Sequence, residues 1–244
     1  MSSQLQNAIE KLYEVFAKYP GNSAMQGSSN YDNLEMWNRE LLSNQLKELS
    51  ASDLSRFAGK AMTTWGDVND YKHFLPRILE LTAEFNTPYE IWIVFDKLEY
   101  GHWNSWNESE IKAIHQYMLQ LWACLIKEDP DKTDFFFMDY FSSIAHFYPS
   151  FSDLLEEWQN NNDKNATLHL AKFIFNERAN IFDKGVIPGF HNKSDHILEL
   201  RSWLLSDKTI TRLEEAFYKY EKESFAETLS WAEKILNDEK KNSM

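Results

Sequence analysis

The chain has 244 residues and a net charge of −13, from 38 acidic and 25 basic side chains. This charge argues against DNA or RNA as a direct partner, because contacts with phosphates dominate nucleic-acid affinity, and it also disfavours an anionic membrane surface. With 43% hydrophobic and 15% aromatic residues, the composition supports a sizeable core, and we predict a single domain over residues 1–244 with a weak subdivision near 185–189.

The cysteine content and the terminal sequence indicate the compartment. Cys124 has no cysteine partner in the chain, which fits a reducing compartment, and its apolar surroundings predict a buried side chain. The N-terminus lacks the basic start and apolar core of a signal peptide. The most apolar run, 135–148, is too short to span a bilayer and instead predicts a helix buried on nearly all sides. We therefore expect a cytoplasmic protein.

Apolar residues recur at helical spacing along the whole chain, and no stretch alternates as a strand would. The first predicted helix carries the stripe Leu5, Ala8, Ile9, Leu12 and Phe16 and ends at Tyr19-Pro20-Gly21. A short helix is expected over 34–42. Ser52 is the predicted N-cap of a third helix, whose stripe continues to Trp65 and ends at Gly66.

The next helix is predicted to begin at Asn69 or Asp70, with Pro76 in its early part. Thr87-Pro88 is expected to open a helix that reaches Tyr100. Asn107 and Glu110 have the spacing of a capping box at the start of a long helix to Lys127. Further helices are expected near 132–147, 150–160, 164–183, 193–206, 208–221 and 223–238. The fold class is thus all-α, with about ten helices as stacked antiparallel hairpins, either solenoid-like or as an irregular globular array.

Two phrases, TTWGDVNDYKHFLPRILEL (63–81) and DKLEYGHWNSWNESE (96–110), concentrate acids, aromatics and histidines. One interpretation is a metal or acid/base site, because carboxylates and imidazoles one helical turn apart share a face. Its residues would be Asp67, Asp70 and His73 with Asp96, Glu99 and His102. The alternative is that Asp67 and Asp70 cap a helix, and that His73 bonds to a carbonyl or a neighbouring acid. Zinc-ligand spacings, nucleophile motifs and phosphate-binding loops are absent from the sequence, so no metal and no cofactor are expected.

A second pair of histidines, His191 and His196, flanks the segment Asn192–Asp195. These imidazoles could serve as a general acid and base. The alternative is that both are exposed loop residues and that Ser194 or Asp195 caps the following helix.

The tryptophans also allow two interpretations. Trp103 and Trp106 precede a strong predicted helix, where they could anchor a protein partner or pack as a hydrophobic staple that fixes how the chain enters the helix. Trp65, Trp92 and Trp122 lie on predicted apolar stripes and are expected in the core, with each indole N–H bonded to a carbonyl or carboxylate.

The two phrases also carry a resemblance. Residues 60–67 (KAMTTWGD), 70–81 and 97–110 resemble an uncharacterised family of bacterial all-helical proteins with AMTTWGD…HFLPR and KLxYxxWxxW phrases. The similarity covers roughly 50–130, and the phrases are long enough to be specific to that family. The resemblance implies a helical fold and brings no activity with it.

We predict a non-enzymatic protein-binding module, most specifically an acidic immunity or antitoxin-type protein that neutralises a basic, toxin-like partner by direct binding. The expected binding surface joins the acids and aromatics of both phrases: Asp67, Asp70, Glu99, Tyr100, Trp103 and Trp106. The alternatives are a metal-assisted hydrolase-like enzyme using the acids and His73, and a helical scaffold or adaptor. Neither nucleic acid nor membrane is expected as a partner, and the oligomeric state stays open.

Overall fold

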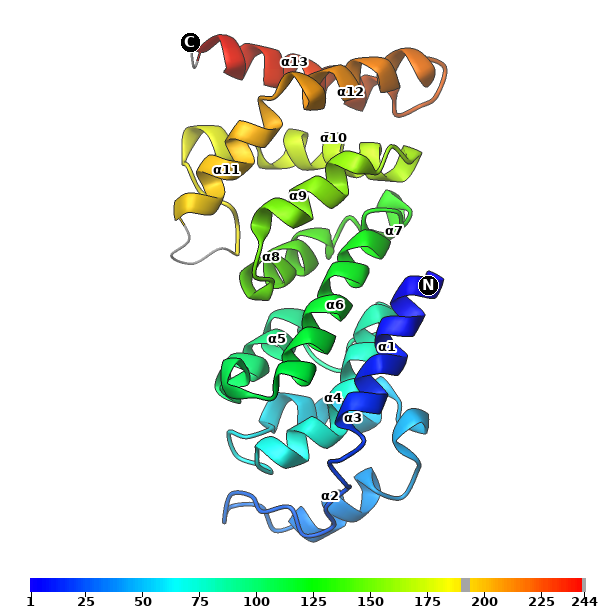
Figure 1. Cartoon of the computed structure of the whole chain (residues 1–244), viewed down its shortest axis with the longest axis vertical. Coiled ribbons are helices and arrows are strands. Elements are labelled where there is room, and N and C mark those ends of the chain that lie inside the picture. The colour runs from blue at the N-terminus through cyan, green and yellow to red at the C-terminus, as the bar shows by residue number, and fades with distance from the viewer. Residues whose placement is uncertain (190–193, 243–244) are drawn as a thin grey trace. The chain divides into compact units, whose positions relative to one another are not determined.

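A computed structural model describes residues 1–189 and 194–242. Within these ranges the regular structure is helical, with thirteen α-helices and no extended strand (Figure 1). Only isolated bridges occur there, where Trp65 pairs with Gly27 and with Ala61. The all-α prediction is confirmed, and the described part of the chain holds more helices than the ten expected.

The chain divides into two compact units, Met1–Leu121 and Trp122–Met244. The division falls inside helix α6, and the stretch 185–189 lies within the second unit. Each unit is described by itself, and the single-domain organisation stays a prediction.

The first unit is built from helices and two 3-10 turns. Its elements are α1 (Ser3–Phe16), α2 (Leu34–Leu41), the 3-10 turn η1 (Leu46–Glu48), α3 (Ala51–Lys60), α4 (Val68–Ala83), α5 (Ile91–Tyr100), the 3-10 turn η2 (Trp103–Ser105) and the first part of α6 (Glu108–Leu125). Helix α1 lies beside α4 (Figure 1), and its whole predicted stripe is buried. Helix α4 stays helical through Pro76, which is buried inside it.

Several helix boundaries in the first unit differ from the prediction. Helix α3 is capped by Ser50, whose Oγ accepts from Asp53 N at 3.2 Å. In return, Asp53 Oδ2 accepts from Ser50 N at 2.9 Å. This reciprocal box satisfies two backbone donors, so it outcompetes the predicted cap at Ser52. The same helix ends at Lys60 because Met62 adopts a left-handed conformation with φ 61°. Helix α5 begins at Ile91, three residues after the predicted Pro88.

The second unit is also built from helices. Its elements are the end of α6, α7 (Pro130–Thr133), α8 (Phe137–Phe147), α9 (Phe151–Asn160), α10 (Lys164–Arg178), a π-helix (Ala179–Asp183), α11 (Ser194–Leu204), α12 (Asp207–Lys219) and α13 (Ala226–Asn242). Helices α10 and α12 both pack against α13 (Figure 1). The expected helices of this half are confirmed within a few residues, except that 132–147 is split between α7 and α8.

Burial in this unit follows the sequence pattern at some positions and departs from it at others. Trp122, Phe141 and Trp158 pack as an aromatic cluster, with ring centroids of Trp122 and Trp158 5.2 Å apart. Cys124 is buried, as predicted. Phe135, by contrast, is exposed, so the apolar run is not buried at its first residue. Across the described ranges, we find no helix with the length and apolar character needed to cross a bilayer.

Candidate functional site

Asp67 and Asp70 form the N-terminal cap of α4. Asp67 Oδ1 accepts from the backbone N–H groups of Asn69 (2.7 Å) and Asp70 (3.0 Å), and Asp70 Oδ2 accepts from Asp67 N at 2.9 Å. Asp70 Oδ1 also accepts from Asn22 Nδ2 at 2.9 Å. A Cβ on Gly66, which has φ 70°, would lie 3.1 Å from the Asp70 side chain, so this arrangement requires glycine. The capping interpretation is confirmed, and it leaves Asp70 buried rather than available on a surface.

His73 has a defined protonation at one nitrogen. Its Nδ1 lies 2.9 Å from the Tyr19 carbonyl oxygen. Because a carbonyl can only accept, Nδ1 carries the proton and donates it. Among residues 1–189 and 194–242, no group of three or more His, Cys, Asp or Glu side chains is placed to hold a metal ion. His73 therefore takes the carbonyl-bonded role of the second interpretation.

Trp103 and Trp106 are buried, at 3% and 9% exposure, which corrects the expectation of an exposed aromatic pair. Trp106 Nε1 donates to the Gly101 carbonyl at 2.8 Å, and Trp103 packs edge-on against His115. The short η2 turn directs both rings inward before α6 begins. Both residues therefore follow the packing alternative.

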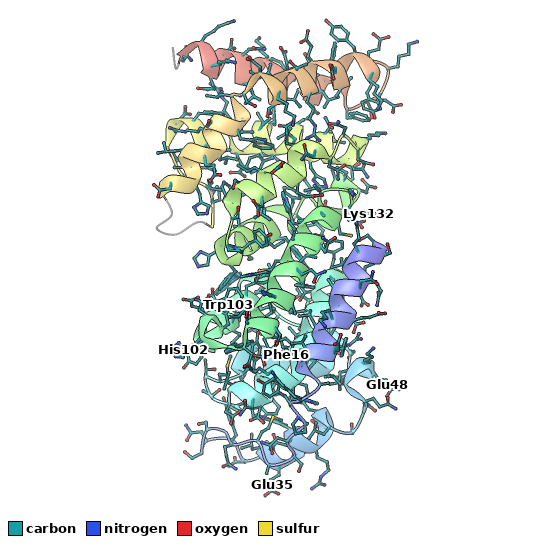
Figure 2. The ribbon with its side chains drawn as sticks, in the orientation of Figure 1. Phe16, Glu35, Glu48, His102, Trp103 and Lys132 are labelled. Carbon is teal, nitrogen blue, oxygen red and sulfur yellow. The ribbon has the colours of Figure 1, made fainter. Side chains whose placement is uncertain are left out.

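The two phrases meet in space, as the hairpin arrangement predicts. Lys97 Nζ donates to Thr63 Oγ1 in the first phrase at 3.5 Å and, just before that phrase, to the Ala61 carbonyl at 2.8 Å. Lys97 is buried, and burial lowers its pKa. His102 lies in the turn between α5 and α6 (Figure 2) and has a left-handed φ of 52°.

A buried ion pair underlies this region, and the sequence did not indicate it. Glu110 is 0% exposed and accepts from Lys72 Nζ (2.8 Å) and from the Tyr19 hydroxyl (2.7 Å). Lys18 pairs with the same carboxylate at 2.6 Å. The ammonium of Lys72 also lies 4.1 Å from the ring centroid of Trp106, within range of a cation–π interaction.

Burial by itself raises the pKa of Glu110. Hydrogen bonds from Lys18, Lys72, Tyr19 and Asn107 outweigh this effect and lower the pKa to about 2. The carboxylate is therefore charged at neutral pH. Its position was predicted as part of a capping box, and the Asn107 side chain does donate to it at 3.2 Å. The partners Lys72 and Tyr19 are far away in sequence, so helix spacing alone could not reveal the pair.

The exposed side of α5 differs from what the sequence predicted. Trp92, expected in the core, is 54% exposed, and Tyr100 is 55% exposed. Asp96 and Glu99 are exposed between them. The spacing of positions 92, 96, 99 and 100 places these four side chains on one side of the helix. We call Trp92, Asp96, Glu99 and Tyr100 the α5 face.

The surroundings of the α5 face are acidic. The exposed charged side chains from 84 to 100 are all carboxylates: Glu84, Glu90, Asp96 and Glu99. Lys97, the cation in this segment, is buried. Trp92 is exposed because the core contacts of α5 are made from its other side, by Ile91, Val94, Phe95 and Leu98. Two of the predicted binding residues, Glu99 and Tyr100, therefore belong to an exposed aromatic and acidic face, and Asp67 is exposed at its cap.

The other tryptophans and histidines named from the sequence are placed as follows by the structure. Trp65 and Trp122 are buried as predicted, with the Trp65 indole bonded to the Asn38 side-chain oxygen and the Trp122 indole to the Leu154 carbonyl. His196 lies in α11 with its ring centroid 4.6 Å from that of Phe151. His191 lies outside the described residues.

No protein-family model, no curated protein and no solved structure matches this chain. These comparisons identify no family for the two phrases, and the all-helical fold class rests on the structure itself.

Proposed function

We propose that this protein is a non-enzymatic protein-binding module that recognises a basic segment of its partner through the α5 face. The observation that carries the proposal is the exposure of Trp92 and Tyr100, each by more than half, on the same side of a helix as two carboxylates. Large exposed aromatics that alternate with acids favour lysine or arginine side chains, because the ring faces and the carboxylates both attract cations.

The dimensions of the face suit a short segment. Trp92 and Tyr100 are eight positions apart, which corresponds to about 12 Å along the helix axis at about 1.5 Å per residue. Two aromatic anchors at that separation, with Asp96 and Glu99 between them, can contact successive turns of a basic helix. The net charge of −13 adds long-range attraction for such a partner.

In its specific form, the proposal is an immunity or antitoxin-type protein that binds a basic, toxin-like protein in the cytoplasm. The acidity and the single cysteine support that form. Membership of the uncharacterised bacterial family is part of the same proposal and rests on the two phrases. Asp67 lies at the exposed cap of α4, whereas Asp70, Trp103 and Trp106 are buried.

The test is quantitative affinity purification of the tagged protein from its native host, followed by binding measurements with the purified partner. We expect a stoichiometric partner with a basic binding segment. Trp92→Ala with Tyr100→Ala should weaken its binding by at least tenfold, because exposed aromatics at the centre of an interface each contribute about 1–2 kcal/mol or more. Asp96→Asn with Glu99→Gln should reduce the association rate and its salt dependence.

The matched control is Trp231→Ala, which removes another exposed tryptophan, from α13 in the second unit. It should leave binding unchanged, as should Glu10→Gln with Glu35→Gln, which neutralise two exposed acids outside the α5 face. A partner that binds the α5-face variants as tightly as wild type would contradict the proposed surface. Growth inhibition by that partner, relieved on co-expression, would distinguish the immunity form from an adaptor.

A further inference from the structure

The segment that connects α1 to α2 leaves an open hollow of about 650 Å³ between residues 23–26 and helix α2. We propose that this hollow binds a zwitterionic dipeptide with apolar side chains. The hollow shares no residue with the α5 face, so the inference is independent of the proposed function.

Two close approaches show which side of α2 faces the connecting segment. A Cβ on Gly21 would lie 2.7 Å from Leu42 Cδ2, and a Cβ on Gly27 would lie 2.9 Å from Leu34 Cδ1. The earlier end of the segment thus contacts the later end of the helix, so the two run in opposite directions. Positions 34, 38 and 42 are each four residues apart and share this side of α2.

Asn38 fixes the middle of the hollow. Its Nδ2 donates to the Met25 carbonyl at 2.8 Å, and its Oδ1 accepts from Trp65 Nε1 at 2.8 Å. Asn38 and Met25 are both buried, and the side chains of Met25, Leu34 and Leu42 supply apolar surface to the walls. A wall that is already held by hydrogen bonds loses little entropy when a ligand binds.

Two opposite charges also line the hollow. Glu35 and Arg39 follow Leu34 and Asn38 by one position on α2 and are exposed (Glu35 is labelled in Figure 2). Their spacing of four residues would allow an ion pair, yet neither side chain makes a hydrogen bond or an ion pair with another described residue. The carboxylate of Glu35 can therefore accept from a ligand ammonium group, and the guanidinium of Arg39 can bind a ligand carboxylate.

The length and volume of the hollow set the ligand class. Side chains four residues apart on a helix have Cβ atoms about 5–6 Å apart, and the two ends of an extended dipeptide are at most about 7 Å apart. A dipeptide can thus reach both charges at once. A cavity of about 150 Å³ holds benzene, so a hollow of about 650 Å³ also has room for two apolar side chains.

NMR titration of the isotope-labelled protein with leucyl-leucine tests the proposal. N-acetyl-leucyl-leucine and leucyl-leucine amide serve as probes that each lack one charge. We expect leucyl-leucine to shift the amide signals of residues 23–26 and α2, and each blocked form to bind about fivefold more weakly, the equivalent of about 1 kcal/mol for an exposed ion pair. Absence of leucyl-leucine binding, equal affinity for the three dipeptides, or equal affinity for free leucine would overturn the proposal.

Variants assign each charge to one end of the dipeptide. Arg39→Gln should abolish the preference for the free carboxylate over the amide and keep the preference for the free amine over the acetyl form. Glu35→Gln should have the reverse effect. Glu40→Gln, at an exposed acid of α2 that does not line the hollow, is the matched control and should keep both preferences. Thermal unfolding verifies that each variant is folded. A folded Arg39→Gln protein that still prefers the free carboxylate would refute the site.

Discussion

The ammonium group of Lys72 donates to Glu110 Oε2 at 2.8 Å, and both side chains are buried from solvent. This contact joins α4 to the first turn of α6, and the Tyr19 hydroxyl bonded to the same carboxylate adds the turn after α1. One carboxylate thus connects three elements of the first unit.

Removal of one charge from this pair should strongly destabilise the protein. Glu110→Gln leaves the Lys72 ammonium buried without its counter-ion, and we expect a loss of about 3–5 kcal/mol in the free energy of unfolding. Lys72→Met with Glu110→Leu removes both charges and should recover most of this loss. Urea denaturation measures both. Glu108→Gln, in an exposed pair with Lys112, is the control and should keep the wild-type midpoint.

The same carboxylate should make the free energy of unfolding decrease in acid. The pKa of Glu110 is lowered from an ordinary value of 4.5 to about 2 in the folded protein. Because the folded-state pKa is depressed, its stabilisation is fully present above pH 4.5 and is lost as the pH falls through about 2. The stability difference between wild type and Glu110→Gln should therefore narrow below pH 4.5. A difference that stays constant in urea titrations between pH 4.5 and about 2 would contradict the assignment.

His169, in the second unit, should make the stability of the protein depend on pH over a higher range than Glu110 does. Burial lowers the pKa of His169 from 6.5 to about 4, and its neutral ring stacks on Phe137 with centroids 4.4 Å apart. The unfolded chain binds the proton first, so stability from this residue should fall as the pH drops from 6.5 to about 4. His169→Gln should remove this part of the pH dependence. Urea denaturation of both proteins between pH 6.5 and about 4 measures this, and an unchanged pH dependence in His169→Gln would contradict the assignment.

Truncation of Trp106 should destabilise the protein far more than truncation of Trp92. Trp106→Ala removes a buried ring, a hydrogen bond to Gly101 and the cation–π contact with Lys72. We expect a loss of about 3–5 kcal/mol in unfolding free energy. Trp92→Ala removes a mostly exposed ring and should change stability by about 0.5 kcal/mol. Acrylamide should quench the exposed Trp92 more efficiently than the buried Trp106. Wild-type fluorescence should therefore lose more of its quenchable fraction in Trp92→Ala than in Trp106→Ala.

The helices and their buried sides could largely be predicted because helical periodicity is a local property. The stripe from Leu5 to Phe16 needs only the 3.6-residue repeat to define an apolar side, and all of it is buried. Caps were less certain, since Ser50 and Ser52 are both good cap residues and only the reciprocal bond with Asp53 selects Ser50. The roles of Asp67 and Asp70 at the start of α4 were local enough to be predicted as one of two alternatives.

The sequence by itself determined the fold class, the acidity and the approximate position of most helices. The tertiary structure alone decided which aromatic side chains reach solvent: Trp92 lies on an apolar-looking stripe yet faces outward, while Trp106 lies in a loop yet packs inward. It also brought Lys72 to Glu110, because the partner of a buried charge is chosen by how helices pack and not by their spacing in the chain. An apolar stripe predicts that one side of a helix will be buried. Only the packing of the helices determines which side chains bury it.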